Sequence, residues 1–303
     1  MKPYFLGIGF SLLLAVSAWA DNLVLVSASY QKNIIALCET DGTVLWQYKT
    51  KGPESGHSGH HEVQMLTNGN ILFHDDWDVV KEMRLDGTEV WRYISSDVHA
   101  FTRLQNGNTM IAESGKNRII IVDKDAKIVS ETPLGKGGRG KTRQVEVLEN
   151  GNYLVCAENP GTVTEYNTQG EILWEYEIGT RVYGAIRLKN GNTLIGSGSG
   201  NSVVEVSPEK KVVWQIKETV PNSKIKLKWT ACLKELPNGH IVVANCHAGA
   251  DNPQLFEMDR DRTVVWAFNQ FELVGNGMAC FDYLTEPQAT NVRKIIASLP
   301  KKN

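Results

Sequence analysis

The stretch HHEVQMLTNGNILFHDDWDVVKEMRLDGTEVWRYI, residues 60–94, decides the fold of this chain. It contains four short strand-like runs, at 60–66, 71–76, 79–85 and 88–94. Asn-Gly separates the first two runs and Asp-Gly the last two, and both dipeptides tolerate the positive φ that a tight two-residue hairpin needs. Short runs bounded by such turns indicate antiparallel strands. The stretch therefore predicts one four-stranded antiparallel sheet.

The same pattern returns along the whole chain. Asn-Gly follows a strand-like run at positions 68, 106, 150, 190 and 238. About twenty residues later a second signal ends in a tryptophan, at Trp46, Trp91, Trp174, Trp214 and Trp266, and a degenerate copy has Ser130 at that place. A period of roughly 40–45 residues built from short strands is typical of a β-propeller blade. We expect the tryptophans to pack blade against blade.

One column of the third strand tests this alignment. The residue eight positions before each Trp, or before Ser130, is mostly apolar: Cys38, Met83, Val122, Tyr166, Val206 and Met258. The residue before each of these is largely acidic: Leu37, Glu82, Ile121, Glu165, Glu205 and Glu257. Neighbouring residues of a strand point to opposite faces, so the pattern predicts a buried column beside a more polar one.

The first and last pieces of the chain complete each other. Residues 22–49 supply three strands without the first strand of a blade, and residues 278–284 supply a strand with nothing after it. The sequence therefore predicts an all-β fold: a six-bladed β-propeller over 21–285, made of four-stranded blades, in which the C-terminal strand completes the N-terminal blade. Such closure removes free sheet edges. A seventh blade through misregistration is the alternative.

The two ends of the chain have their own signatures. Residues 1–20 combine Lys2, an apolar run and the small-residue site Ala18-Trp19-Ala20, which indicates a cleaved secretory signal rather than a membrane anchor. The protein is therefore expected to be periplasmic or secreted. Residues 286–303 form a short tail, in which 291–298 could make one or two helical turns.

Charge bears on the class of partner, and cysteine content bears on disulfide pairing. The formal net charge is −2 without a large basic cluster, which argues against nucleic acid as the main partner. Five cysteines follow the signal, so at least one is unpaired in an exported protein. Cys232 and Cys280 share one register in neighbouring inner strands. A disulfide between them is possible, but two small buried thiols near the crowded axis are the favoured interpretation.

The inner strands of a propeller line its central channel, and one of their columns is rich in polar groups. The residue five positions before the closing Leu is in turn His61, His99, Arg143, Tyr183, Ala231 and Ala279. His60, Glu62 and Trp229 lie nearby in sequence. Two imidazoles, a guanidinium and a phenol suit an oxyanion such as sulfate, phosphate or carboxylate, and Trp229 could stack on a ring.

Two other interpretations of this column stay open. The polar side chains could satisfy one another and water in a solvated channel. Alternatively, His57, His60 and His61 with His99 could hold zinc, but no carboxylate or cysteine completes a recognisable spacing. No metal site and no cofactor is therefore predicted, and His74 and His247 are interpreted as turn or rim residues.

The tryptophan signals DGTVLW, DGTEVW and QGEILW resemble the propeller repeat of pyrroloquinoline-quinone-type proteins. HHEVQMLTNGNIL and VHAFTRLQNGNTM are also similar to arylsulfotransferase-type propeller repeats. The chain departs from both families. It has room for six blades where the quinone dehydrogenases have eight, it lacks their adjacent cysteine pair, and it lacks the extra domain of the arylsulfotransferases. Quinone-dependent oxidation is therefore not expected.

Three functions follow from these observations. The first is an exported binding module that takes a small anionic or aromatic ligand, or a protein partner, at the channel mouth, using His60, Glu62, Arg143, Tyr183 and Trp229. The second, implied by the resemblance, is an arylsulfotransferase-like enzyme with His61 or His99 as the nucleophile and Arg143 as an oxyanion clamp. The third is a scaffold that binds partners through its rim.

Overall fold

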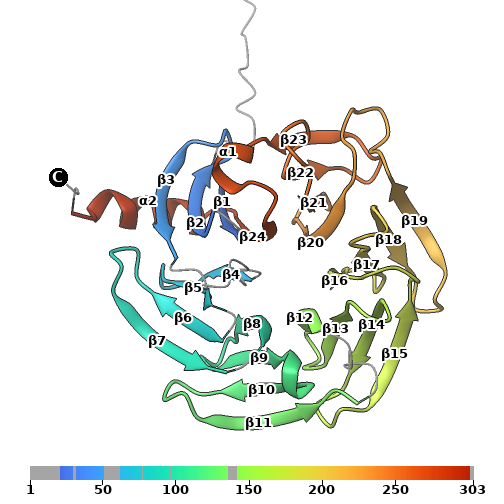
Figure 1. Ribbon diagram of the computed structural model, residues 1–303, viewed down its shortest axis with the longest axis horizontal. Coiled ribbons are helices and arrows are strands. Elements are labelled where there is room, and N and C mark those ends of the chain that lie inside the picture. The colour runs from blue at the N-terminus through green and yellow to red at the C-terminus, as the bar shows by residue number, and fades with distance from the viewer. Residues whose placement is uncertain are drawn as a thin grey trace, which may run out of the picture.

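A computed structural model describes residues 21–29, 32–50, 62–76, 78–95, 97–135 and 142–300. These residues form six four-stranded antiparallel sheets that stand as blades around a central axis (Figure 1). The predicted six-bladed β-propeller is confirmed. The predicted signal at 1–20 and the histidines at 57, 60 and 61 lie outside the described residues.

The blades follow one another in chain order, and each runs from an inner to an outer strand. Blade 1 contains β24 (Met278–Leu284), β1 (Leu23–Ala28), β2 (Ile34–Glu39) and β3 (Val44–Lys49). Blade 2 contains β4 (Val63–Met65), β5 (Ile71–Asp76), β6 (Val79–Met83) and β7 (Glu89–Ile94). Blade 3 contains β8 (Val98–Arg103), β9 (Thr109–Glu113), β10 (Arg118–Val122) and β11 (Ile128–Pro133).

The second half of the ring has the same order. Blade 4 contains β12 (Thr142–Val147), β13 (Tyr153–Ala157), β14 (Thr162–Tyr166) and β15 (Ile172–Glu177). Blade 5 contains β16 (Gly184–Arg187), β17 (Thr193–Gly196), β18 (Ser202–Val206) and β19 (Val212–Lys217). Blade 6 contains β20 (Trp229–Glu235), β21 (Ile241–Cys246), β22 (Leu255–Met258) and β23 (Val264–Phe268). Three short helices, η1 (Ser114–Lys116), α1 (Phe271–Val274) and α2 (Gln288–Ser298), connect or follow the strands.

The ring closes as the sequence predicts. β24 pairs antiparallel with β1, and Leu23 lies opposite Leu284. The last strand of the chain is therefore the innermost strand of the first blade. Backbone hydrogen bonds between the two ends of the chain hold the circle together, so neither end leaves an open inner edge.

The Asn-Gly turns differ from the two-residue hairpin that the sequence suggests. Met65 pairs with Ile71, so residues 66–70 form the loop. Within it Gly69 alone has a positive φ, of 82°, and Asn68 accepts the N–H of Asn70 through its side-chain oxygen at 3.0 Å. Asn-Gly thus lies in a loop that is longer than a two-residue hairpin. The Asn side chain accepts a backbone N–H, and the Gly is the residue in the left-handed conformation.

The structure corrects one expectation for the third strand, namely that its acidic column would be the more polar, less buried one. The apolar column is buried as predicted, with Met83 and Met258 at 1% and 0% exposure. The acidic residues beside it are also buried, with Glu82, Glu205 and Glu257 at 3%, 2% and 0% exposure. Both faces of a blade pack against neighbouring blades, so a buried carboxylate is tolerated only when donors surround it.

Arginines from the next blade supply those donors. The Arg103 guanidinium of blade 3 binds the Glu82 carboxylate of blade 2 at 2.8 Å and stacks 5.4 Å from the Trp91 ring. Arg187 of blade 5 binds Glu165 in the same way at 2.8 Å and lies 5.5 Å from the ring of the blade 4 tryptophan. Arg260 of blade 6 repeats the contact with blade 5.

The tryptophans join the blades as expected, and by a specific bond. The indole N–H of Trp46 in blade 1 donates to the Leu85 carbonyl of blade 2 at 2.8 Å. Trp266 in blade 6 donates to the Thr40 carbonyl of blade 1, also at 2.8 Å. Trp174 and Trp214 donate to the following blade in the same way. At these four positions the ring packs and its N–H is satisfied at the same time, whereas the buried N–H of Trp91 has no such partner among the described residues.

The favoured prediction, that Cys232 and Cys280 are two separate buried thiols, is wrong. Cys232 on β20 and Cys280 on β24 form a disulfide, with their Cα atoms 5.1 Å apart. The shared register of the two strands brings these residues within disulfide range because blades 6 and 1 converge at the axis. Cys38, Cys156 and Cys246 are free and buried.

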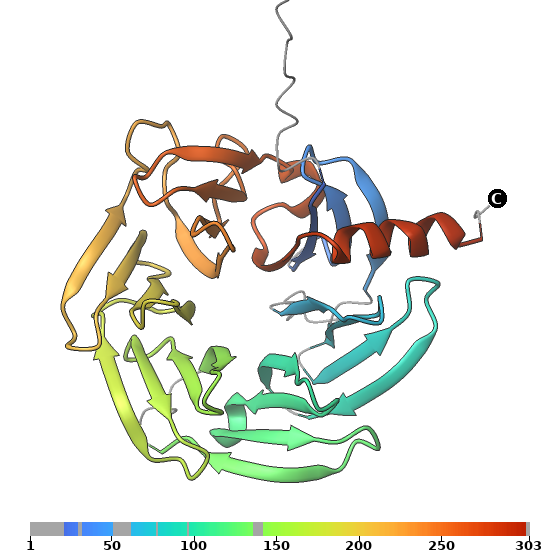
Figure 2. The same cartoon turned by 180° about the vertical axis from the view of Figure 1, so that it is seen from behind.

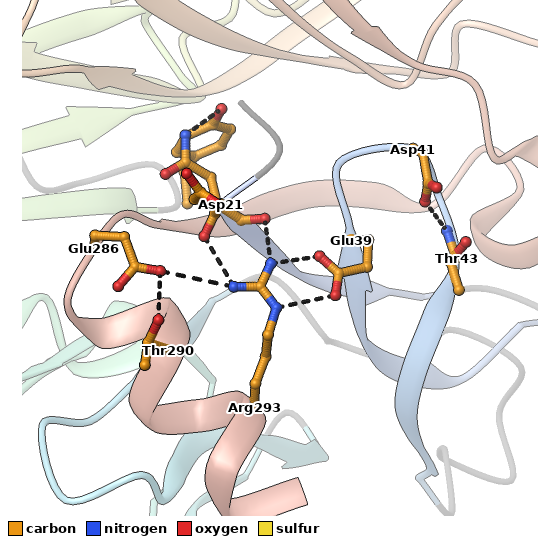
Figure 3. A network of polar contacts seen from close by, with 9 residues as sticks. Asp21, Glu39, Asp41, Thr43, Glu286, Thr290 and Arg293 are labelled. Carbon is orange, nitrogen blue, oxygen red and sulfur yellow. Dashed lines mark hydrogen bonds and ion pairs between the residues drawn. The ribbon is translucent and has the colours of Figure 1, made fainter. Parts of the chain in front are cut away.

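Helix α2 fastens the C-terminal tail to blade 1, across the face seen in Figure 2. Arg293 binds the Glu39 carboxylate through two nitrogens and donates to the carbonyl of Asp21 at 3.0 Å (Figure 3). Ala289 and Val292 are fully buried in a cluster with residues of blades 1 and 2, and the Gln288 amide donates to the Met65 carbonyl of blade 2 at 3.0 Å. The helix begins earlier than the sequence suggests and covers the junction of the two chain ends. Among the described residues, no helix combines the length and apolar character that crossing a membrane requires.

Candidate functional site at the channel mouth

The innermost strands β4, β8, β12, β16, β20 and β24 surround the axis (Figure 1). Side chains of one inner strand bind backbone groups of the next. The Asp282 carboxylate accepts the N–H of Met65 at 3.0 Å, and the Gln64 amide oxygen accepts the N–H of Arg103 at 2.9 Å. The inner edge of each blade is thereby satisfied without a further strand.

One mouth of the channel gathers polar side chains from several blades. The inner strands begin at this face and the second strands end at it, because the two are antiparallel. Residues at the start of the innermost strand of a blade therefore lie close to residues that follow the second strand of a blade. The side chains that contact one another here are Asp97, His99, Arg143, Glu158, Arg181, Trp229 and His247, which we call the mouth cluster.

His99 and Arg143 lie together, as the sequence column predicts. Nη1 of Arg143 is 3.0 Å from Nδ1 of His99 and 2.9 Å from its Nε2. Asp97 Oδ1 lies 3.1 Å from Nε2. Burial lowers the pKa of His99 and the Arg143 charge adds to that, whereas Asp97 opposes it. The neutral imidazole is therefore favoured, and both of its nitrogens lie within hydrogen-bond distance of charged partners: Nε2 lies near Asp97 and Arg143, and Nδ1 near Arg143.

Glu158 ties two arginines together at the mouth. It follows β13, is 7% exposed, and its carboxylate binds Arg143 and also Arg181, the latter at 3.2 Å. Arg143 and Arg181 precede or begin the inner strands of blades 4 and 5. One buried carboxylate thus orients two guanidinium groups, one half-buried and one exposed.

Trp229 provides an aromatic surface beside these charges. It begins β20, and the Arg181 guanidinium lies 5.8 Å from its ring centroid. The His247 ring meets the indole edge to face at 6.0 Å. His247 has a positive φ of 59°, which is uncommon for a residue with a side chain and directs the ring toward Trp229.

Two of the predicted site residues lie apart from the mouth cluster. Tyr183 is 5% exposed and packs in an apolar cluster with Ala231 and Cys232. Glu62 precedes β4 and lies within 4.8 Å of the Cys232–Cys280 sulfurs. The structure therefore brings together His99, Arg143 and Trp229 of the predicted set, and His60 and His61 fall outside the described residues.

The channel contains two carboxyl groups with raised pKa. Burial raises the pKa of Glu62 to about 8, and the charge of Asp282 contributes. Burial also raises the pKa of Glu146 to about 7, although the Arg187 N–H, 2.7 Å away, acts in the other direction. At neutral pH the channel below the mouth therefore carries less negative charge than its sequence suggests.

Sequence reasoning missed Asp97 and Glu158, and it took His247 for a rim residue. A signal for Glu158 exists: Ala-Glu ends the second strand of two consecutive blades, at 112–113 and 157–158. A repeated acidic residue at a strand end next to the channel is a candidate partner for the arginines of the inner strands. Asp97 lies in an irregular segment and has no such signal.

A family model described as outer membrane protein assembly factor BamB, of the PQQ type, matches residues 115–250. The matched region runs from blade 3 into blade 6 and contains the Glu165–Arg187–Trp174 contact between blades 4 and 5. The match supports PQQ-type propeller repeats in residues 115–250. No curated protein matches its sequence significantly.

Solved structures share the propeller fold at low sequence identity. A protein of unknown function from Bacteroides caccae is 23% identical, with a TM-score of 0.75, and the match covers 88% of this chain and 99% of that one. Virginiamycin B lyase from Staphylococcus aureus is 13% identical, with a TM-score of 0.57 and coverage of 82% and 88%. A streptogramin B lyase structure is 15% identical, with a TM-score of 0.59 and coverage of 84% and 89%. These likenesses concern the fold.

Proposed function

We propose that this protein is an exported β-propeller that binds a small aromatic anion at the mouth cluster. One observation carries the proposal: a single buried carboxylate, Glu158, holds two arginines of different blades beside the Trp229 ring. Surface arginines without such a partner sample many rotamers, whereas these two are oriented before a ligand arrives. Preorganised donors lower the entropy that binding costs.

The chemistry of the cluster suggests the ligand class. An exposed guanidinium suits a carboxylate, sulfate or phosphate group. The adjacent indole face favours an aromatic ring on the same molecule. His99 is neutral, so its role in this proposal is to position Arg143 rather than to contribute charge.

The arylsulfotransferase-like alternative places different demands on the same residues. A nucleophilic imidazole needs a free nitrogen lone pair. Both His99 nitrogens are engaged, by Arg143 and Asp97, so attack by His99 requires Arg143 to release the ring. His61 stays the other predicted nucleophile. A sulfo-histidine trapped with an aryl sulfate would favour this alternative.

The proposal includes export of the protein, and it has a protein partner as its alternative. The secretory pattern of residues 1–20 supports a periplasmic or secreted location. The family match bears the name of an outer membrane assembly factor, which supports a protein partner as an alternative occupant of the rim. Such a partner would leave the mouth cluster without a ligand.

Calorimetric titration with aryl carboxylates and aryl sulfates tests the proposal. The key variant is Arg181→Met, because Arg181 is exposed and its loss spares the fold. The matched control is Arg92→Met, which removes an exposed arginine paired with Glu89 on an outer strand. We expect the first variant to weaken binding of an aromatic anion by about tenfold or more and the control to bind normally. Equal binding by both variants would place the ligand elsewhere, and absence of binding across the panel would favour the rim scaffold.

A further inference from the structure

Three potential metal ligands meet where blades 6, 1 and 2 converge. They are Cys232 on β20, Cys280 on β24 and Glu62 just before β4. Their sulfur and carboxylate atoms all lie within 4.8 Å of one another. Both cysteines are 2% exposed, and Glu62 is partly exposed. The site is distinct from the mouth cluster. The sequence pointed to each of the three residues for another reason, but it did not bring them together.

We propose that reduction of the Cys232–Cys280 disulfide converts this trio into a binding site for a thiophilic divalent cation, with Zn²⁺ as the natural candidate. In the oxidised form the sulfurs are joined and have little affinity for a metal. In the reduced form two thiol groups and one carboxyl group lie close together and can lose their protons to a metal ion. The junction of three blades then has two alternative states, a covalent one and a metal-bound one.

The reduction step balances with a dithiol as the reductant. The dithiol transfers two electrons and two protons to the disulfide, the S–S bond breaks, and two thiols form while the dithiol becomes a disulfide. Metal binding then displaces the two thiol protons, because thiolate is the form that coordinates. Glu62 coordinates as a carboxylate, so the proton that it carries below its pKa of about 8 is released to solvent together with the two thiol protons.

The spacing of the trio suits a tetrahedral ion. Zinc binds sulfur at about 2.3 Å and carboxylate oxygen at about 2.0–2.2 Å, which places ligand atoms roughly 3.5–3.8 Å apart. The Cα atoms of the two cysteines are 5.1 Å apart, so rotation of the side chains about χ1 can bring both sulfurs to one ion without backbone movement. Two sulfurs favour zinc over the hard cations magnesium and calcium.

The surroundings of the trio support a cation and a fourth ligand. Asp282 lies on β24, two residues from Cys280, and contributes negative charge next to Glu62. Oδ1 of Asp282 binds Nζ of Lys234 at 2.8 Å, so the Asp282 carboxylate is held in place. Because the trio supplies three ligands, the fourth position is left for water or an incoming group from the channel, as in catalytic zinc sites.

The other cysteines provide the contrast. Cys38, Cys156 and Cys246 are buried and free, and within the described ranges they take no part in a comparable group of three ligands. A thiol-dependent metal site in the described part of the chain is therefore specific to the junction of blades 6, 1 and 2.

Cobalt is the probe, because Co²⁺ bound to thiolate gives an intense near-ultraviolet charge-transfer absorption that oxygen and nitrogen ligands do not give. Purified protein is titrated with Co²⁺ in its oxidised form and after treatment with a phosphine reductant that does not bind the metal. We expect one Co²⁺ per chain with the thiolate band in the reduced protein alone, and displacement of cobalt by Zn²⁺.

Two variants separate this site from other thiols and from loss of folding. Glu62→Gln keeps both cysteines and should weaken metal binding at least about tenfold, since even partners outside the coordination sphere are worth about 10–100-fold. Cys246→Ser removes a buried thiol elsewhere and should bind as the parent does. Circular dichroism spectra monitor the fold of both.

Three results would overturn the inference: no thiolate band after reduction, equal binding by oxidised and reduced protein, or unchanged affinity in Glu62→Gln. Cobalt bound by histidines or surface carboxylates would show itself as binding without the sulfur band.

Discussion

Replacing Arg103 by Met tests whether the buried Glu–Arg–Trp contacts hold the blades together. Glu82 is 3% exposed and accepts from Arg103 at 2.8 Å and from the Asn70 amide at 2.6 Å. Methionine keeps the aliphatic stem but removes the guanidinium. The Glu82 carboxylate is then left in the blade interface with amide donors alone, and Trp91 loses its stacked cation.

The magnitude follows mainly from the lost contacts with Glu82 and Trp91; the hydrogen bond from Nε of Arg103 to the Thr109 hydroxyl, 3.0 Å long, is lost as well. A hydrogen bond to a charged group is worth about 1.5–3 kcal/mol, and a cation stacked on an aromatic ring about 0.5–1 kcal/mol where it is exposed. The Arg103 side chain is 21% exposed, so solvent compensates part of the loss. We expect Arg103→Met to lower the free energy of unfolding by about 3 kcal/mol, which is the lower end of the range for breaking a buried ion pair.

Equilibrium urea denaturation followed by circular dichroism measures this change. Arg92→Met is the control, because the Arg92–Glu89 pair lies on the surface of an outer strand and its loss should leave stability almost unchanged. Glu82→Gln combined with Arg103→Met removes both charges. The double variant should be more stable than the sum of the single changes predicts.

Two results would refute the reasoning. One is a loss in Arg103→Met no larger than that in the Arg92→Met control. The other is additivity of the Glu82 and Arg103 changes within about 0.5 kcal/mol, which would show that the two side chains act independently.

Two further predictions concern the channel. Glu158→Gln weakens the carboxylate bridge that orients Arg143 and Arg181, so the affinity for an aryl carboxylate should fall by about threefold to tenfold in calorimetric titration; an unchanged or higher affinity would mean that this bridge does not prepare the site for the ligand. Glu146→Gln tests the raised pKa of about 7 against an ordinary value of 4.5. The folded state then binds more protons than the unfolded state between these values, so the Glu146 contribution makes stability fall as pH rises through that interval. Glu146→Gln keeps the acceptor for the Arg187 N–H, and its urea midpoint should depend less on pH between 4.5 and about 7. A dependence as steep as that of the parent would contradict the raised pKa.

The repeated contacts between blades lie apart from the mouth cluster. Stability is concentrated in repeated units such as Glu82–Arg103–Trp91, which lie away from the mouth, near the turns that contain Asn-Gly. The mouth residues Asp97, Glu158 and Arg181 lie in segments that connect strands. Propellers place binding groups on such segments because changes there leave the blades intact.

The repeat alone determined the architecture. Asn-Gly turns, the tryptophan signal and the unpaired strand at 278–284 predict six blades and their closure, because each depends on local pattern and on counting. The same patterns place His99 and Arg143 in equivalent positions of adjacent inner strands, and their contact follows from that register. Here sequence reasoning works because a propeller repeats one local solution around an axis.

The tertiary structure decided which groups are paired and therefore what the channel can do. The buried state of Glu82 and its partner Arg103 could not be read from strand polarity, because a blade has neighbours on both faces. The Cys232–Cys280 disulfide and the meeting of Arg143 and Arg181 on Glu158 depend on how closely the blades converge. Distances across an axis arise from the packing of all six blades at once, so no single repeat contains them.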